Sequence, residues 1–139
     1  MIQKGLQVGA AIVLLGMALP QTAAAETLER AADLVENAIE EHRLFQTCMS
    51  LLPREPAMVS DIWTLLANDA LEVLSIHPGT ESISATLRAA LEPGALVPSL
   101  DTSYGELLEF CLADPEWSIR LQRLEIIQLP RDLELLFEN

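Results

Sequence analysis

Apolar residues between positions 27 and 52 recur every three or four residues, which is the spacing of one face of an α-helix. Glu29, Asp33, Glu36 and Glu40 fall between them at the same spacing and therefore occupy the opposite face. This pattern predicts an amphipathic helix of about 25 residues with one buried face. Its apolar positions are Leu28, Ala31, Val35, Ala38, Ile39, Phe45, Cys48, Met49 and Leu52.

Proline and glycine divide the following segment into two further helices. Pro53 and Pro56 predict the end of the first helix, and the apolar spacing predicts a second one from about Ala57 to Ile76. A His-Pro-Gly turn separates it from a third, shorter helix with Thr80 or Ser82 as its N-cap. This helix ends at a Pro-Gly pair, and residues 95–102, which have no helical period, predict a loop.

Ser103 and Glu106 have the spacing of a capping box at the start of a fourth helix. In this motif the serine oxygen and the glutamate carboxylate accept hydrogen bonds from backbone N–H groups that lack partners within the helix. The predicted helix covers residues 104–113. Its predicted buried side carries Leu107, Leu108, Cys111 and Leu112.

The C-terminal segment, residues 116–137, fits two structures. Its residues are good helix formers, which favours a helix that ends at Leu129 and a short one after Pro130. Alternating apolar and polar side chains also fit a β-hairpin, with Leu124 and Ile126 facing Leu133 and Leu135. The sequence therefore predicts a mainly α domain of four to six helices, with a short C-terminal hairpin as the alternative.

The N-terminal 25 residues have the three-part pattern of a secretory signal peptide. Lys4 precedes an uncharged apolar stretch, residues 5–19, and small residues precede a predicted cleavage point between Ala25 and Glu26. The apolar stretch is shorter than the roughly 20 residues that span a membrane, so we expect cleavage rather than a permanent anchor. No cysteine precedes Cys48, so a lipoprotein anchor is not expected. The expected localisation is the periplasm of a Gram-negative bacterium.

Cleavage would leave one domain, residues 26–139, with 114 of the 139 residues. It would also remove the only lysine, which leaves 7 arginines against 21 acidic residues and a net charge of −14. A chain this acidic repels polyphosphate and anionic lipid. We therefore expect neither nucleic-acid binding nor stable membrane insertion. Without lysine, the domain also lacks the residue that forms Schiff bases.

Cys48 and Cys111 are the only cysteines, and a pair of cysteines in an exported protein is expected to form a disulfide. Both lie on predicted apolar helix faces, so the bond would connect the first and fourth helices and clamp the core. Their spacing differs from the C-x-x-C of redox proteins, and a zinc site needs more ligands. A structural disulfide is therefore predicted, and neither a metal nor another cofactor is expected.

Motifs for common catalytic chemistries are absent from the sequence. The chain has no G-x-S-x-G, no glycine-rich phosphate loop, no H-E-x-x-H and no C-x-x-C-H. His42 lies at the border of the apolar face of the first helix, where a nitrogen is expected to reach solvent or a carboxylate. His77 precedes a proline and is expected to be a loop residue. No catalytic residues and no enzymatic activity are therefore expected.

These observations favour a non-enzymatic module that binds another periplasmic or envelope protein through an apolar surface. Trp63 and Trp117 are candidates for that partner surface if either side chain is exposed. One alternative is a carrier of a small apolar ligand or lipid in a cavity between helices. Another is an acid-stress chaperone that loosens when its carboxylates are protonated. The sequence leaves the partner and the oligomeric state open.

Overall fold

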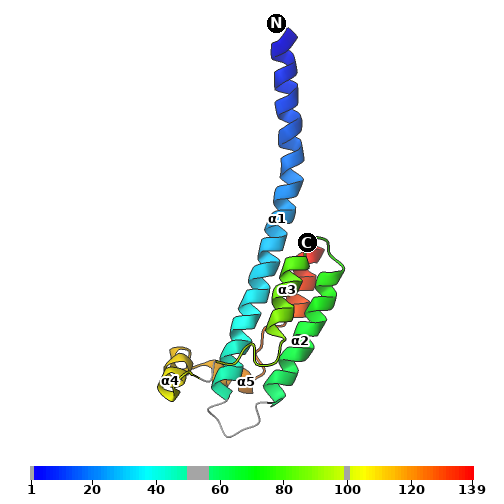
Figure 1. Cartoon of the computed structure of the whole chain (residues 1–139). Coiled ribbons are helices and arrows are strands. Elements are labelled where there is room, and N and C mark those ends of the chain that lie inside the picture. Colours follow the sequence, from blue (N-terminus) through cyan, green and yellow to red (C-terminus); the bar gives the residue numbers. More distant parts are fainter. Residues whose placement is uncertain (1, 50–56, 99–100) are drawn as a thin grey trace.

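A computed structural model describes residues 2–49, 57–98 and 101–139 of the chain. These residues form six α-helices and no β-strand, which confirms the predicted mainly α fold. The helices are α1 (Ile2–Met49), α2 (Ala57–Ser75), α3 (Glu81–Ala90), α4 (Tyr104–Ala113), α5 (Trp117–Gln122) and α6 (Leu129–Glu138). Figure 1 shows that the N-terminal half of α1 extends beyond the other helices, whereas α2, α3 and α6 lie beside its C-terminal half.

Helix α1 contains the predicted amphipathic helix and continues it toward the N-terminus. Between residues 28 and 49 its predicted apolar positions are buried or half-buried, and its four predicted acidic positions are exposed. The predicted cleavage point between Ala25 and Glu26 lies within this helix. Leu52, Pro53 and Pro56, where the helix was predicted to end, lie outside the described residues. No helix in the described part of the chain has the length and apolar character needed to cross a membrane.

The main hydrophobic core lies between α1, α2, α3 and α6. Small residues on α2, Ala67 and Ala70, are completely buried in it, and so are the large residues Leu129 and Leu133 of α6. Helix α6 packs against α2 as well as against α1. The C-terminal helix is therefore part of the core that holds α1 and α2 together.

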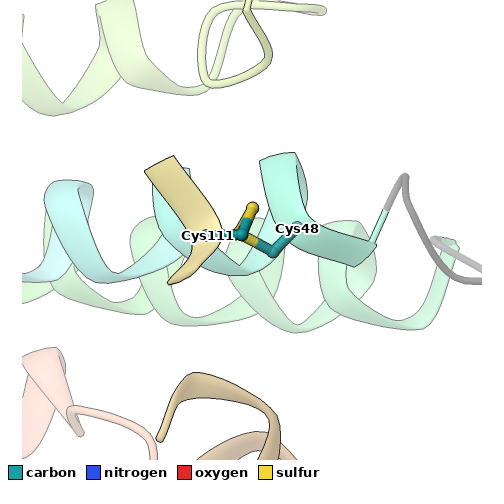
Figure 2. The surroundings of a disulfide bond; sticks show 2 residues. All are labelled: Cys48 and Cys111. Atoms are coloured by element: carbon teal, nitrogen blue, oxygen red, sulfur yellow. A yellow bond between two sulfur atoms is a disulfide. The ribbon is translucent and has the colours of Figure 1, made fainter. Parts of the chain in front are cut away.

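A second hydrophobic cluster lies at the C-terminal end of α1, where α4 and α5 join it. Phe45 of α1 and Trp117 of α5 are buried there together with Cys48 and Cys111. The two cysteines form a disulfide with a Cα–Cα distance of 5.7 Å, as the sequence predicted. The bond connects α1 to α4, the first and fourth helices of the chain (Figure 2).

The turn between α2 and α3 depends on Gly79 and Thr80. Gly79 has a φ of +81°, and a Cβ at this position would lie 3.1 Å from a methyl group of Leu28, so glycine fits this site for two reasons. Thr80 precedes α3, but its side chain makes no capping hydrogen bond. Its hydroxyl instead donates to the carbonyl oxygens of Leu74 (2.7 Å) and His77 (3.0 Å), which ties the turn to the end of α2.

The C-terminal segment is helical, but the predicted helix from Glu116 to Leu129 is interrupted after Gln122. The N–H of Leu124 donates to the carbonyl of Leu121 (3.1 Å), and the N–H of Glu125 donates to the carbonyl of Arg120 (2.8 Å). These two bonds form a Schellman motif, in which the residue after the helix adopts a left-handed conformation. Leu124 has a φ of +56° and occupies the position where glycine is usual. Because a leucine stands there, the sequence carries no signal for this helix end.

The alternative C-terminal hairpin is wrong. Residues 123–128 are neither helix nor strand, and α6 contains the residues that would have formed the second strand. Pro130 lies in the first turn of α6, where its missing N–H costs no hydrogen bond. Leu133 is buried in the main core, while Leu135, two residues later, is exposed, so helical rather than strand contacts organise this segment.

Candidate functional site

Helix α4 begins with the predicted capping box and has the predicted bounds. The N–H of Glu106 donates to Oγ of Ser103 (3.2 Å), and the N–H of Ser103 donates to Oε2 of Glu106 (3.0 Å). These reciprocal bonds define the start of the helix by local interactions alone. The helix therefore does not depend on a large buried face for its starting point.

The apolar side chains of α4 are mostly not buried by the fold. Cys111 is its only buried residue, while Tyr104 is 67% exposed, Phe110 43% and Leu112 70%. Leu107 is half-buried, and so is the leucine that follows it, Leu108. The prediction that Leu112 lies on a buried side is wrong, because α4 packs chiefly against α1 and its other faces remain open. Figure 1 shows α4 on the side of α1 away from α2.

The disulfide holds α4 in place. Cys48 is completely buried on α1, and Figure 2 shows the bond crossing directly to Cys111 of α4. A covalent link can fix a helix whose packing alone would be too small, since a ten-residue helix is marginal in water by itself. The fold thus presents an apolar helix in a fixed position without burying it.

An open groove lies beside α4, and we call it the α4 groove. Its volume is about 260 Å³, and it lies between α4, the C-terminal half of α1 and the loop after α3. Leu96 is buried in it and Leu107 half-buried, whereas Val97 and Phe110 are exposed at its surface. The described residues that line it are Arg43, Thr47, Leu96, Val97, Pro98, Thr102, Glu106, Leu107 and Phe110.

The charged side chains at the α4 groove are mainly acidic. Glu106 lines it, and Asp101 and Glu109 directly neighbour the lining residues Thr102 and Phe110 in the sequence. All three carboxylates are exposed, and none forms an ion pair with a described residue. Among the described residues of the lining, Arg43 is the only basic one, and its guanidinium pairs with Glu40 of the same helix.

Trp63 and Trp117 are buried, so neither belongs to an exposed partner surface. Their side chains are 3% and 9% exposed. The indole N–H of Trp63 donates to the carbonyl of Ala90 (3.1 Å) and so joins α2 to the end of α3. Trp117 packs in the second cluster. The surface interpretation of these two residues is therefore corrected, and the exposed apolar residues of α4 take their place.

A buried carboxylate, Glu41, connects α1 to the segment between α5 and α6. Its Oε1 accepts a hydrogen bond from Arg120 (2.9 Å), and its Oε2 accepts one from the N–H of Ile127 (2.8 Å). Arg120 also donates to Asp114 (3.2 Å), which follows α4. Burial raises the pKa of Glu41, while the Ile127 N–H and the Arg120 guanidinium act against this shift. These contacts organise the C-terminal half of the chain around one side chain of α1.

His42, the next residue, is fully buried against aromatic rings. Its ring centroid lies 4.7 Å from that of Trp63 and 5.7 Å from that of Phe45. Neither ring nitrogen has a hydrogen-bond partner among the described residues. The expectation that a nitrogen reaches solvent or a carboxylate is wrong, because α2 covers this side of α1. Burial lowers the pKa of His42 to about 4, so the ring is neutral at pH 7.

The remaining polar groups of the described chain are dispersed. The ring of His77 stacks on Phe137 at a centroid distance of 4.0 Å, near the end of the chain. No three His, Cys, Asp or Glu side chains within the described ranges gather closely enough to hold a metal ion. The α4 groove, with the exposed Val97 and Phe110 in its lining, is therefore the candidate functional site.

Comparisons of the chain with protein-family models, with curated proteins and with solved structures found no match in any of the three.

Proposed function

We propose that this protein is an exported, non-enzymatic module that binds another periplasmic or envelope protein through the α4 groove. The observation that carries the proposal is the apolar lining of the α4 groove, in which Val97 and Phe110 are exposed beside the half-buried Leu107. Large apolar side chains that gather on a small domain are typical of interaction surfaces. Aromatic residues contribute most to binding energy at such surfaces, and Phe110 is the aromatic residue among the described lining residues.

The Cys48–Cys111 disulfide supports both parts of the proposal. A helix that is already fixed on α1 loses little conformational entropy when a partner binds, so more of the contact energy appears as affinity. Disulfides also persist in oxidising compartments, which agrees with export. Export is tested by N-terminal sequencing of the protein purified from the envelope of its producing cells. A mature chain that begins at Glu26 is expected, and a chain that retains residues 1–25 would contradict cleavage.

Partner binding is tested by affinity capture from envelope extract with matched variants. The unmodified protein is expected to retain a partner that Phe110→Ser loses, because the substitution removes an exposed ring from the α4 groove. Ile76→Ser is the control, since Ile76 is a highly exposed apolar residue just after α2 and does not line the groove. A partner that both variants retain, or that both lose, would contradict the proposed site.

An acid-stress chaperone is a second candidate, and the burial of His42 favours it. An imidazolium at this position would be a charge in contact with the rings of Trp63 and Phe45, so acid would loosen α1 from α2 and expose core surface. The protein would then prevent aggregation of a client at about pH 3 but not at pH 7. Equal client aggregation with and without the protein at acid pH would exclude this function.

A further inference from the structure

The α4 groove is open and smaller than the sites that enclose small molecules. Its volume of about 260 Å³ is below the usual 300–1,000 Å³ of ligand pockets, which surround most of the ligand surface. Leu96, Val97, Leu107 and Phe110 give it an apolar lining. A groove of this kind accepts a few apolar side chains that project from a larger segment outside it.

The groove offers few backbone partners, so it favours a partner segment that satisfies its own backbone hydrogen bonds. The groove lies between α1, α4 and the loop after α3; most backbone groups of the two helices bond within each helix, and no strand edge exists among the described residues to which a strand could add. A helix is the segment that meets this condition, because its N–H and C=O groups are already paired. Helices that bind in grooves insert apolar residues at i, i+3 or i+4, and i+7.

Charge determines which helix fits. Glu106 lines the groove and forms no ion pair with a described residue, and Arg43 of the same lining is already paired with Glu40. Asp101 and Glu109 are exposed and directly precede the lining residues Thr102 and Phe110 in the sequence. An acidic segment would be repelled there, whereas a basic one would be attracted and oriented. A second copy of the chain would bring the same acidic residues and a further net charge of −13, or −14 after the predicted cleavage, which disfavours self-association.

We propose that the α4 groove binds a basic amphipathic helix of a partner protein, whose apolar face inserts between α1 and α4 and whose Lys or Arg residues meet Asp101, Glu106 and Glu109. This inference rests on the proposed function and specifies the chemistry of its partner. The apolar contacts supply most of the affinity, and the charges supply selectivity and a dependence on salt.

The test uses the mature, oxidised protein and three synthetic peptides with the same leucine positions. One peptide has lysine at its polar positions, one has glutamine and one has glutamate. In heteronuclear NMR titrations at low salt, the Leu/Lys peptide is expected to bind and to shift the resonances of Leu96, Val97 and Phe110. The Leu/Glu peptide is expected not to bind. Phe110→Ser is expected to weaken Leu/Lys binding by about tenfold or more.

Two double variants, each of which removes two negative charges, distinguish the effect of Asp101 and Glu109 from the effect of the protein's overall net charge on peptide binding. Asp101→Asn/Glu109→Gln is expected to weaken Leu/Lys binding about fivefold, because it removes two exposed charges that directly neighbour the lining residues Thr102 and Phe110 in the sequence. Asp61→Asn/Asp69→Asn removes two exposed charges from α2 and is expected to change the affinity for the Leu/Lys peptide by less than about twofold. Glu106 is left intact because it caps α4. Equal weakening by both double variants would overturn the inference.

The remaining outcomes distinguish this inference from the proposed function. Equal binding of the Leu/Gln and Leu/Lys peptides would overturn the inference that the partner helix is basic, while the groove would remain a binding site. If a native partner depends on Phe110 but the Leu/Lys peptide does not shift groove resonances, the inference fails and the proposed function stands. Dimerisation that Phe110→Ser abolishes would show that a second copy occupies the groove. A lipid that copurifies in the groove would show a carrier, and either result overturns the inference.

Discussion

The guanidinium of Arg120 lies 2.9 Å from the buried carboxylate of Glu41, although 79 residues separate them in the sequence. The same carboxylate accepts a hydrogen bond from the N–H of Ile127, just before α6 begins. The Arg120 guanidinium also lies 5.5 Å from the centre of the Phe45 ring. This pair therefore positions α5 on α1 and directs the chain into α6, which completes the main core.

Arg120→Met is expected to destabilise the protein by about 2–3 kcal/mol, because it leaves Glu41 buried without its counter-charge. The expected loss is at the low end for buried pairs because Arg120 is partly exposed. Arg123→Met is the matched control, since Arg123 is largely exposed and lies 3.9 Å from Glu125. Its expected effect is within about 0.5 kcal/mol. Urea denaturation followed by circular dichroism measures both, and equal losses would contradict the assigned role of Arg120.

Leu124→Gly is expected to stabilise the protein by about 0.5–1 kcal/mol. Leu124 has a φ of +56°, a conformation that costs a leucine about 1–2 kcal/mol and glycine almost nothing. Its side chain is exposed, so little packing is lost, although glycine gains entropy in the unfolded chain. Thermal unfolding of the two proteins gives the difference. A clear loss of stability would show that the Leu124 side chain makes contacts that outweigh the backbone cost.

His42 is expected to make the protein less stable as pH falls from about 6.5 to 4. Its pKa is lowered to about 4 in the folded state, so over this range the unfolded chain binds a proton that the folded protein does not. The shift corresponds to about 3 kcal/mol, lost progressively toward pH 4 and unchanged below it. Burial raises the pKa of Glu41, so the contribution of that group has the opposite sign and increases as pH falls.

The contribution of His42 is isolated by comparing the protein with His42→Phe, because both retain Glu41. Urea denaturation at pH 7 and at pH 4.5 gives the change in unfolding free energy for each. His42→Phe is expected to lose about 2–3 kcal/mol less than the unmodified protein over this interval. Parallel pH profiles for the protein and His42→Phe would rule out a neutral, buried His42.

Removal of the disulfide by Cys48→Ala/Cys111→Ala is expected to destabilise the protein by about 4 kcal/mol. The bond closes a loop with a sequence separation of 63 residues, and the chain-entropy relation gives a value of this size. Amide hydrogen exchange is expected to show loss of protection first in α4, because that helix has little packing of its own. Protection of α4 equal to that of α2 and α6 in the variant would show that packing, rather than the bond, positions α4.

Elements with local signals could be predicted from the sequence. The spacing of carboxylates and apolar residues identifies the amphipathic half of α1, and Ser103 with Glu106 identifies the start of α4 through hydrogen bonds between neighbours. The cysteine pair follows from the predicted export and from the absence of other cysteines. Each of these features depends on residues that are close together in the chain or on the number of cysteines.

Features that depend on distant contacts could not be predicted. His42 is buried because Trp63 of α2 covers it, and Glu41 is distinguished from its exposed neighbour Glu40 only by Arg120 and Ile127. The candidate site was missed for a related reason. Apolar residues around a short helix usually indicate burial, and whether Phe110 and Leu112 are covered depends on which helices reach α4. The one available signal was that α4 is apolar on more than one face.

Photo-cross-linking from position 110 in living cells tests the central claim most directly. Phe110→p-benzoylphenylalanine places the reactive group at the α4 groove, and Ile76→p-benzoylphenylalanine places it on an exposed apolar site elsewhere. Position 110 is expected to give one covalent adduct with an envelope protein, attached at a helix that carries lysine or arginine beside its apolar face. No adduct at position 110, or the same adducts from both positions, would contradict the account.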